Sequence, residues 1–289
     1  MTNTPMIISH IVGGLGNQLF QYAIGRQLAL LRKGDLFLDI SGFASYRLRE
    51  FCLPNLSLVY QMADEETIKW HQKRTSRLYP FRRLLTPMNR FTYLKEKSMA
   101  YDASVLLHKE SVYLEGYWQS QNYFLGIRDR LLTECLPKKI NDAAVHLRDQ
   151  IKKTEGAVSV HVRRGDYVDN KKTHAYHGVC GPEYYKKAAE TIRTNILNPH
   201  FFVFSDDTPW VRQNMQLPGN TTYIEGNRDY EDLFLMSLCR RHIIANSSFS
   251  WWGAWLNASP NKIVIAPKNY YANPRANTRD LLPEEWTKL

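Results

Sequence analysis

The sequence is poor in cysteine and has no long hydrophobic run. Its four cysteines (Cys52, Cys135, Cys180 and Cys239) lie far apart and form no CxxC pair. This favours reduced thiols over a disulfide framework. No stretch approaches the ~20 apolar residues that span a bilayer, and the N-terminus lacks the basic patch and apolar core of a secretory signal. We therefore expect a cytoplasmic protein.

The chain does have enough apolar surface to form globular domains. Of its 289 residues, 44% are hydrophobic, 12% aromatic and 23% charged. Burial of that much apolar surface can offset the entropy lost on ordering a chain, which excludes a disordered or fibrous protein. The length corresponds to one large domain or to two of roughly 100–200 residues each.

Positive charge is concentrated in one segment. The chain carries a net charge of +10, and residues 69–97, with nine basic residues and one acid, supply +8 of it. Apolar residues such as Trp70, Leu78 and Phe81 stand between these charges. Two interpretations stay open: a peripheral contact with the inner face of a membrane, and a solvated helical face packed on its domain. We expect no nucleic-acid partner, because no zinc-finger, RNP-like or basic-region pattern accompanies the charge.

The order of apolar runs predicts a parallel α/β protein. The first half has strand patterns at 7–12, 36–40 and 112–116, a helical pattern at 19–31 and a mostly helical stretch over 62–150. After a polar stretch at 152–156 the pattern starts again, with strands at 158–162, 201–205, 242–245 and 263–266 and helices at 182–196 and 229–240. We therefore predict two Rossmann-like domains, 1–151 and 152–289, facing each other across a cleft.

The strongest site candidates follow the strand predicted at 158–162. Ligands of open α/β sheets bind beyond the carboxyl ends of the strands. Arg163 and Arg164 stand there, with Asp166 close behind and His161 inside the strand. Two guanidinium groups at a buried strand end are costly unless they meet anions, and their forks match phosphate oxygens. The alternative is a strand-end ion pair between an arginine and Asp166.

Two further strand ends carry polar side chains. Asp206 and Asp207 follow the strand at 201–205, and paired carboxylates can hold a metal, accept protons or hydrogen-bond a base or sugar. No third ligand stands at a useful spacing, so we predict no metal site; the alternative for Asp207 is the N-cap of a helix near Pro209. The strand at 242–245 is followed by groups suited to phosphate, sugar or base, namely Asn246, Ser247, Ser248, Phe249 and Ser250.

A glycine-rich loop, residues 13–18, follows the first strand. It does not form a dinucleotide fingerprint, because Leu19 stands where the third glycine belongs. Its glycines let backbone N–H groups approach a substrate closely at a helix N-terminus. The alternative is a tight turn without a ligand.

Together these motifs resemble the bacterial members of glycosyltransferase family 11, the α-1,2-fucosyltransferases. The blocks of the resemblance occur in family order at 13–22, 114–120, 161–167, 177–180, 204–207 and 246–252. The resemblance implies a variant glycosyltransferase-B fold and a metal-independent enzyme with no cofactor. Its donor would be GDP-β-L-fucose and its acceptor a β-galactoside-terminated oligosaccharide. The product, Fucα1-2Gal, would form with inversion, in surface polysaccharide or O-antigen biosynthesis.

The resemblance also implies residue roles. Arg163, helped by Arg164, would neutralise the charge that develops on the β-phosphate. The other donor contacts would be Asp206 or Asp207 and His161 to guanine or ribose, and Asn246, Ser247 and Ser248 to phosphate. In the N-terminal half, Gly14, Asn17 and Gln18 would face fucose or the acceptor. Asp166, Asp39 and Glu115 are candidates for a general base. The alternatives are a GDP-fucose transferase of another linkage and a non-catalytic glycan-binding protein.

Overall fold

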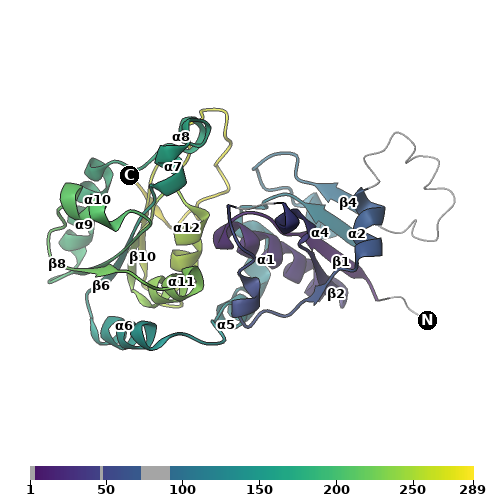
Figure 1. The fold of residues 1–289 in the computed structure, drawn as a ribbon, viewed down its shortest axis with the longest axis horizontal. Coiled ribbons are helices and arrows are strands. Elements are labelled where there is room, and N and C mark those ends of the chain that lie inside the picture. Colours follow the sequence, from purple (N-terminus) through teal and green to yellow (C-terminus); the bar gives the residue numbers. More distant parts are fainter. Residues whose placement is uncertain (1–3, 46–47, 73–91) are drawn as a thin grey trace. The chain divides into compact units, whose positions relative to one another are not determined.

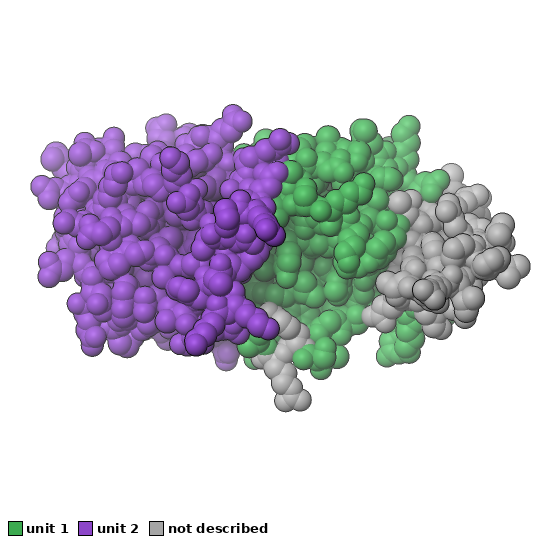
Figure 2. Space-filling model, turned by 90° about the horizontal axis from the view of Figure 1, so that it is seen from above, with its two compact units in different colours: residues 1–54, 58–134 green, residues 55–57, 135–289 purple. Residues whose placement is uncertain are grey.

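The computed structural model describes residues 4–45, 48–72 and 92–289 (Figure 1). The chain divides into two compact units, shown in different colours in Figure 2. Unit 1 comprises residues 1–54 and 58–134, and unit 2 comprises residues 55–57 and 135–289. The predicted domain boundary at 151/152 falls later in the chain, so residues 135–151 belong to the second unit.

Within the described residues, unit 1 is built on a five-stranded parallel sheet of order β3-β2-β1-β5-β4. Its strands are β1 (Met6–His10), β2 (Asp35–Asp39), β3 (Gln61–Met62), β4 (Thr92–Lys95) and β5 (Val112–Glu115). Its helices are α1 (Leu15–Arg32), α2 (Glu65–Gln72), α4 (Ser104–Leu107) and α5 (Arg128–Glu134). Short 3-10 turns lie at Ser41–Ala44, Leu53–Asn55, Gln121–Tyr123 and Leu125–Ile127.

Helix α1 shows how sequence produces this unit. Most of its residues between Leu15 and Ala29 are buried, including Leu19, Ala23 and Leu28, and the helix packs on β1 and β2. Lys33, in the left-handed conformation with φ 52°, ends the helix and turns the chain into β2. Because β1 pairs with β2 on one side and β5 on the other, the strand order reverses at β1.

Unit 2 is built on a six-stranded parallel sheet of order β11-β10-β9-β6-β7-β8. Its strands are β6 (Ala157–Val162), β7 (His200–Ser205), β8 (Asn220–Ile224), β9 (Arg241–Ile243), β10 (Ile263–Ala266) and β11 (Thr287–Lys288). Its helices are α6 (Asp142–Lys153), α7 (Gly165–Asp169), α8 (Lys171–His177), α9 (Pro182–Asn195), α10 (Thr208–Asn214), α11 (Asp229–Leu238) and α12 (Ser248–Trp255).

Both faces of this second sheet are covered by helices, which explains its continuous apolar strands. On one face, Val158 and Phe201 pack with Tyr185 and Ile192 of α9. On the other, residues of α6 and α11 form a second cluster with Ala157, Phe202 and Phe204. Trp251, Trp252 and Trp255 of α12 are fully buried. The tryptophans of this helix are therefore core residues.

The predicted fold class, α/β with two Rossmann-like domains, is confirmed. The predicted strands at 7–12, 36–40, 112–116, 158–162, 201–205, 242–245 and 263–266 correspond to β1, β2, β5, β6, β7, β9 and β10. The region 62–150 is less helical than predicted, because β4 lies beside β5 in it. Both are parallel strands of one sheet, and β4 is one of its two edge strands in the described residues.

The basic segment at 69–97 is described only in part. Residues 73–91, which carry most of its charge, lie outside the described residues, so its membrane interpretation stays a prediction. Among the helices that the structure describes, none is both long and apolar enough to cross a membrane.

Candidate functional site

The site in unit 2 lies where the strand order reverses. β6 pairs with β7 on one side and with β9 on the other. The chain therefore leaves β6 and β9, which are neighbours, in opposite directions along the sheet. Such a reversal leaves a crevice at the carboxyl ends of the strands. The loop after β6 carries Arg163 and Arg164, and the loop after β9 carries Asn246 and Ser247. The structure thus brings together residues predicted from separate motifs.

Both arginines are held by carboxylates. Arg163 forms ion pairs with Asp166 through Nη2 and with Asp206 through Nη1, the latter at 2.8 Å. Nε of Arg164 lies 3.1 Å from Oδ2 of Asp207. Only 19% of the Arg163 side chain and 16% of the Arg164 side chain are exposed. The ion pair that the sequence offered as an alternative is therefore present, and it extends to both aspartates after β7.

These ion pairs leave part of each guanidinium for a ligand. A guanidinium has five N–H donors, and the contacts to Asp166 and Asp206 engage one on each Nη of Arg163. Arg164 is paired through Nε and stacks on the Trp210 ring, with its Cζ 3.6 Å from the ring centroid. Such stacking fixes the guanidinium plane. The arginines are therefore oriented before any anion arrives.

Asp207 has two roles. Its Oδ2 accepts from Arg164, and its Oδ1 accepts from the backbone N–H of Trp210 at 3.2 Å, which caps α10. The helix N-cap predicted as the alternative for this residue is confirmed. Asp206 accepts from the backbone N–H of Arg164 at 2.8 Å in addition to its ion pair. Both carboxylates thus hold the loop after β6.

His161 lies buried beneath the arginines. It is 5% exposed, its ring centroid lies 5.5 Å from that of Phe249, and within the described residues its Nδ1 has no hydrogen-bond partner. Burial, and secondarily the positive charge of Arg163, lower the pKa of His161 to about 3. The imidazole is therefore neutral near pH 7 and is suited to hydrogen bonding rather than to proton transfer.

The loop after β9 differs from its predicted role in one respect. Asn246 is 3% exposed, and its Nδ2 donates to the carbonyl of His177 at 2.9 Å. Ser247 caps α12 by accepting from the N–H of Phe249 at 3.3 Å, and the Ser250 hydroxyl bonds back to the Ser247 carbonyl. Asn246, Ser247 and Ser250 therefore build the loop. Ser248, at the first position of α12, is half-buried and the most exposed of the predicted hydroxyls.

Helices α7 and α8 follow the loop after β6, and the carbonyl of His177 at the end of α8 accepts from Asn246. The Tyr167 and His177 rings stack at 4.5 Å, and Cζ of Arg163 lies 5.4 Å from the Tyr167 centroid. The His177 carbonyl accepts from the N–H of Ala272 at 3.2 Å. Burial lowers the pKa of His177, although the charge of Asp166 opposes the shift. Tyr167 is therefore a site residue that the strand-end rule did not single out.

Sequence reasoning also missed a pair of acceptors after β8. Oδ1 of Asn227 is buried and has no hydrogen-bond partner within the described residues, while its Nδ2 donates to Oδ1 of Asp232 at 2.9 Å. Burial raises the pKa of Asp232 to about 7, and the neighbouring Asp229 and Glu231 add to the shift. β8 lies next to β7, so this pair extends the carboxyl edge that carries the arginines.

Unit 1 has its own reversal point, between β1 and β5. Gly13 adopts φ 83° and Gly14 precedes the first turn of α1. Oδ1 of Asn17 accepts from Nε2 of Gln119 at 2.9 Å, and Nε2 of Gln21 donates to the carbonyl of Gly116 at 3.1 Å. The start of α1 is thus tied to the loop after β5 at the edge where a ligand of this sheet would bind.

Gln18 holds the first loop in place. It is fully buried, and its Nε2 donates to the carbonyls of Gly13 at 2.8 Å and Glu50 at 2.7 Å. Its Oε1 accepts from the N–H of Cys52 at 2.9 Å. All of these partners are backbone groups, so the amide acts on the loop conformation, whereas Gly14 and Asn17 are half-buried.

The three general-base candidates differ in accessibility. Asp39 is fully buried and accepts from the hydroxyl of Tyr113 at 2.5 Å, so its carboxylate has no access to an acceptor sugar. Oε1 of Glu115 pairs with Nζ of Lys95 at 2.9 Å. Asp166 is the most exposed of the three, at 42% of its side chain, and is paired with Arg163.

A family model described as "Glycosyl transferase family 11" matches residues 6–289. The chain belongs to glycosyl transferase family 11. It is 36% identical over 98% of its length, and 99% of the relative, to an Escherichia coli protein named "Alpha-1,2-colitosyltransferase". It is 32% identical, over 97% of its length and 99% of the relative, to the E. coli "O-antigen biosynthesis glycosyltransferase WbnK".

One solved structure with a similar fold is an Arabidopsis thaliana FUT1 mutant in complex with GDP. The likeness has a TM-score of 0.49 at 13% identity and covers 91% of this chain and 70% of that one. Membership of family 11 makes the protein a glycosyltransferase, as predicted. The cleft expected between the two domains stays a prediction, because the structure describes each unit by itself.

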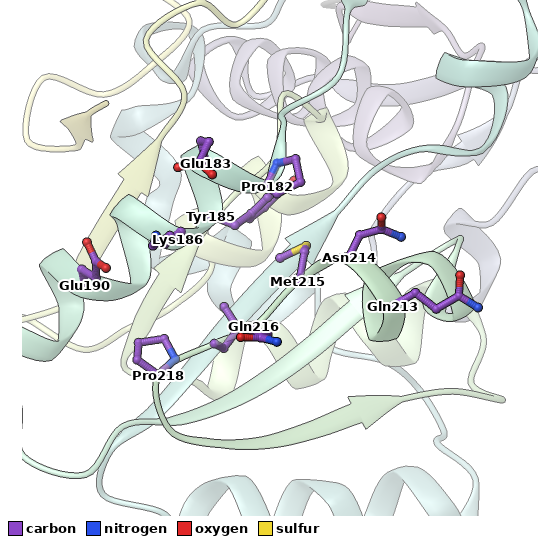
Figure 3. A pocket seen from close by; sticks show the side chains of 11 residues that line it. Pro182, Glu183, Tyr185, Lys186, Glu190, Gln213, Asn214, Met215, Gln216 and Pro218 are labelled. Atoms are coloured by element: carbon purple, nitrogen blue, oxygen red, sulfur yellow. The ribbon is translucent and has the colours of Figure 1, made fainter.

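Two other features of this family 11 chain lie outside the candidate site. A groove of about 450 Å³ lies between α9 and the end of α10 with the segment after it, and is lined by Glu183, Lys186 and Gln213 among others (Figure 3). None of the predicted site residues lines it. In the described part of the chain, no group of three or more His, Cys, Asp or Glu residues is placed to hold a metal ion.

Proposed function

We propose that the protein transfers L-fucose from GDP-β-L-fucose to the 2-hydroxyl of a terminal galactose, giving Fucα1-2Gal with inversion at the anomeric carbon. The proposal agrees with the names of its relatives, one an α-1,2 glycosyltransferase and the other an enzyme of O-antigen biosynthesis. The setting is synthesis of a surface polysaccharide by a cytoplasmic enzyme. Its partners are the nucleotide sugar and a β-galactoside-terminated oligosaccharide.

The observation that carries the proposal is the pair of oriented guanidinium groups at the reversal point of unit 2. When the bond to GDP breaks, negative charge develops on the β-phosphate while the sugar becomes oxocarbenium-like. Arg163, with N–H donors beyond those paired with Asp166 and Asp206, neutralises that charge where it develops. Arg164 adds a second fixed positive charge. A neutral glycan would not require two such cations, which disfavours a simple glycan-binding protein.

The acceptor pair after β8 suits the guanine base of the donor. Guanine presents N1–H and N2–H₂ donors on one edge, and Oδ1 of Asn227 and the carboxylate of Asp232 are neighbouring acceptors. Asp206 and Asp207 are occupied by the arginines, so we assign base recognition to this pair instead. His161 keeps its proposed contact with the nucleotide, through a neutral nitrogen.

The phosphate contacts proposed for the loop after β9 divide into two groups. Ser248 can present its hydroxyl at the N-terminus of α12, where backbone N–H groups also favour anions. Asn246, Ser247 and Ser250 act by fixing the loop, since their side chains bond to its own backbone and to His177.

Deprotonation of the acceptor does not require a strong base in this account. Asp166 is the most accessible candidate, and it is paired with Arg163. A weak base suffices where the bond to the leaving group breaks well before the acceptor hydroxyl loses its proton. In unit 1, Gly14 before α1 and Asn17 in its first turn are the proposed contacts to fucose or acceptor.

We propose that transfer is independent of metal ions, because the two arginines supply the positive charge that a divalent cation supplies in other glycosyltransferases. The test is transfer to lactose from GDP-fucose in the presence of EDTA. The expected product is 2′-fucosyllactose, identified by its linkage. An acceptor that lacks the galactose 2-hydroxyl should give no product, and product from it would show another linkage.

One relative favours a second candidate donor. The E. coli protein of 36% identity is named for colitose, which is fucose without its 3-hydroxyl. The same arrangement of arginines and guanine acceptors would hold GDP-colitose equally, because neither contacts the sugar. Competition between GDP-fucose and GDP-colitose for one β-galactoside acceptor, read as the ratio of kcat/KM, decides between the donors.

A further inference from the structure

Glu96 is the one acid of the basic segment 69–97. It lies directly after β4, and its side chain reaches the loop after β5. Its Oε2 accepts from the backbone N–H of Tyr117 at 2.7 Å, and its Oε1 accepts from that of Trp118 at 3.0 Å. Burial raises the pKa of this carboxyl, while the two backbone donors oppose the shift. One half-buried carboxylate therefore bridges two successive peptide groups.

The loop that Glu96 holds has an unusual backbone. Trp118 adopts φ 56°, in the left-handed region that bulky residues rarely enter, and it is 2% exposed. A Cβ added to Gly116 would lie 2.4 Å from Cβ of Glu96, so only glycine fits beside the carboxylate. Such a conformation persists only where its surroundings hold it. Glu96 supplies that support from the neighbouring strand.

The held loop leads directly to the reversal point of unit 1. Gln119, the residue after Trp118, donates from Nε2 to Oδ1 of Asn17 at 2.9 Å. Gln21 fixes the other end of the loop by donating to the carbonyl of Gly116. A chain of contacts therefore runs from Glu96 through the backbone of Trp118 and the side chain of Gln119 to Asn17.

We propose that Glu96 is a positioning residue for sugar transfer, which fixes the 116–119 loop so that Gln119 orients the Asn17 amide towards the sugar. The proposal rests on the proposed function of Asn17. The Asn17 amide has one oxygen and one NH₂ group, and Gln119 donates to the oxygen, so the NH₂ group is directed to other acceptors such as sugar hydroxyls. Without that bond the amide could rotate and present the wrong group.

The Glu96→Gln variant tests this role. The amide oxygen of glutamine can replace one of the two carboxylate acceptors. Its NH₂ group would face the second backbone N–H, and because both are donors that hydrogen bond is lost. We expect the kcat/KM for the acceptor to fall on the order of 10-fold to 10²-fold, since small misplacements of positioning groups have effects of that size. The Kd of GDP should stay within about twofold, because the nucleotide residues belong to unit 2.

Asp64→Asn is the matched control. Asp64 also accepts from a backbone N–H in unit 1, that of Thr67 at 2.8 Å, but it caps α2 and is exposed. This variant should keep wild-type kinetics. A fall equal to that of Glu96→Gln would mean that any lost carboxylate cap in this unit impairs the enzyme.

A double-mutant cycle separates positioning from general stabilisation. If Glu96 acts through Gln119, the variant Glu96→Gln with Gln119→Ala should lose no more acceptor kcat/KM than Gln119→Ala alone. Additive losses, wild-type acceptor kinetics in Glu96→Gln, or an equal loss of GDP affinity would each overturn the proposal. Absence of transfer by the wild-type protein would instead contradict the proposed function, which keeps the two outcomes distinct.

Discussion

Nη1 of Arg163 lies 2.8 Å from Oδ2 of Asp206, and this ion pair joins the ends of β6 and β7. The other oxygen of Asp206 accepts from the backbone N–H of Arg164, also at 2.8 Å. One carboxylate therefore fixes the side chain of the first arginine and the backbone of the second. The arrangement places two cations at a strand end without leaving either unpaired, which would be costly in a partly buried site.

Gly165 should be essential to this arrangement. A Cβ there would lie 2.6 Å from Oδ2 of Asp206, so the Gly165→Ala variant must displace the carboxylate that holds Arg163. We expect kcat to fall on the order of 10-fold to 10²-fold. Gly181→Ala is the control, because Gly181, the N-cap of α9, also lies at the start of a helix and its Cβ would meet nothing within 4 Å. Equal kinetics in the two variants would show that Asp206 does not position the arginines.

Donor affinity should depend on pH through Asp232. Burial raises the pKa of its carboxyl to about 7, and only the ionised form has both carboxylate oxygens free of a proton, one accepting from Asn227 and one available to a guanine donor. The Kd of GDP should therefore decrease as pH rises and level off above about 7, with a difference of about tenfold between pH 6 and pH 8. Titration of GDP into wild type and Asp232→Asn checks this. A pH dependence that survives in the variant would assign it to another group.

Asp232 should also affect folding stability, with a sign that follows from its raised pKa. The folded protein binds the proton more tightly than the unfolded chain, so between about pH 4 and pH 7 it holds more protons. The contribution of Asp232 to the free energy of unfolding therefore decreases as pH rises through this window and is constant above it. In urea unfolding, the difference in free energy of unfolding between wild type and Asp232→Asn should fall as pH rises from about 4 to about 7. A flat difference would contradict the assignment.

A buried ion pair should be important to unit 1. Glu134, at the end of α5, accepts from Nη2 of Arg26 at 2.7 Å and from the hydroxyl of Tyr22 at 2.5 Å, and its side chain is 8% exposed. Glu134→Ala would leave Arg26 buried and unpaired, which should reduce the free energy of unfolding by ~3–5 kcal/mol. Glu225→Ala, which breaks an exposed pair with Arg212, should reduce the free energy of unfolding by less than about 1 kcal/mol. Comparable losses in urea unfolding would contradict this difference.

The elements that could be predicted from the sequence are those whose apolar pattern is imposed by burial on both faces. β6 and β7, buried along most of their length, were found in this way. β4 and β8 were missed because they are edge strands: β8, Asn220–Ile224, is largely polar and only Ile224 is buried. Edge strands need one apolar face at most, so their sequences resemble loops.

The same limit explains what was missed in the site. Asp206 and Asp207 were found because the strand before them was recognised, whereas Asn227 follows the unrecognised β8. Glu96 could not have been found, because its role depends on the pairing of β4 with β5, which joins residues distant in sequence. Gln18 was predicted in the loop but belongs to α1, which begins at Leu15, and its contacts with three backbone groups are visible only in three dimensions.

The most direct test of this account is the rate of GDP release from GDP-fucose, with lactose and EDTA present, for wild type and Arg163→Ala. Loss of a guanidinium that meets developing phosphate charge should lower kcat by ~10²–10³-fold. The exposed Arg212→Ala serves as control and should retain wild-type turnover. Turnover by wild type in EDTA that collapses only in Arg163→Ala is the predicted result. Undiminished turnover in Arg163→Ala would contradict the central claim that this arginine stabilises the departing diphosphate.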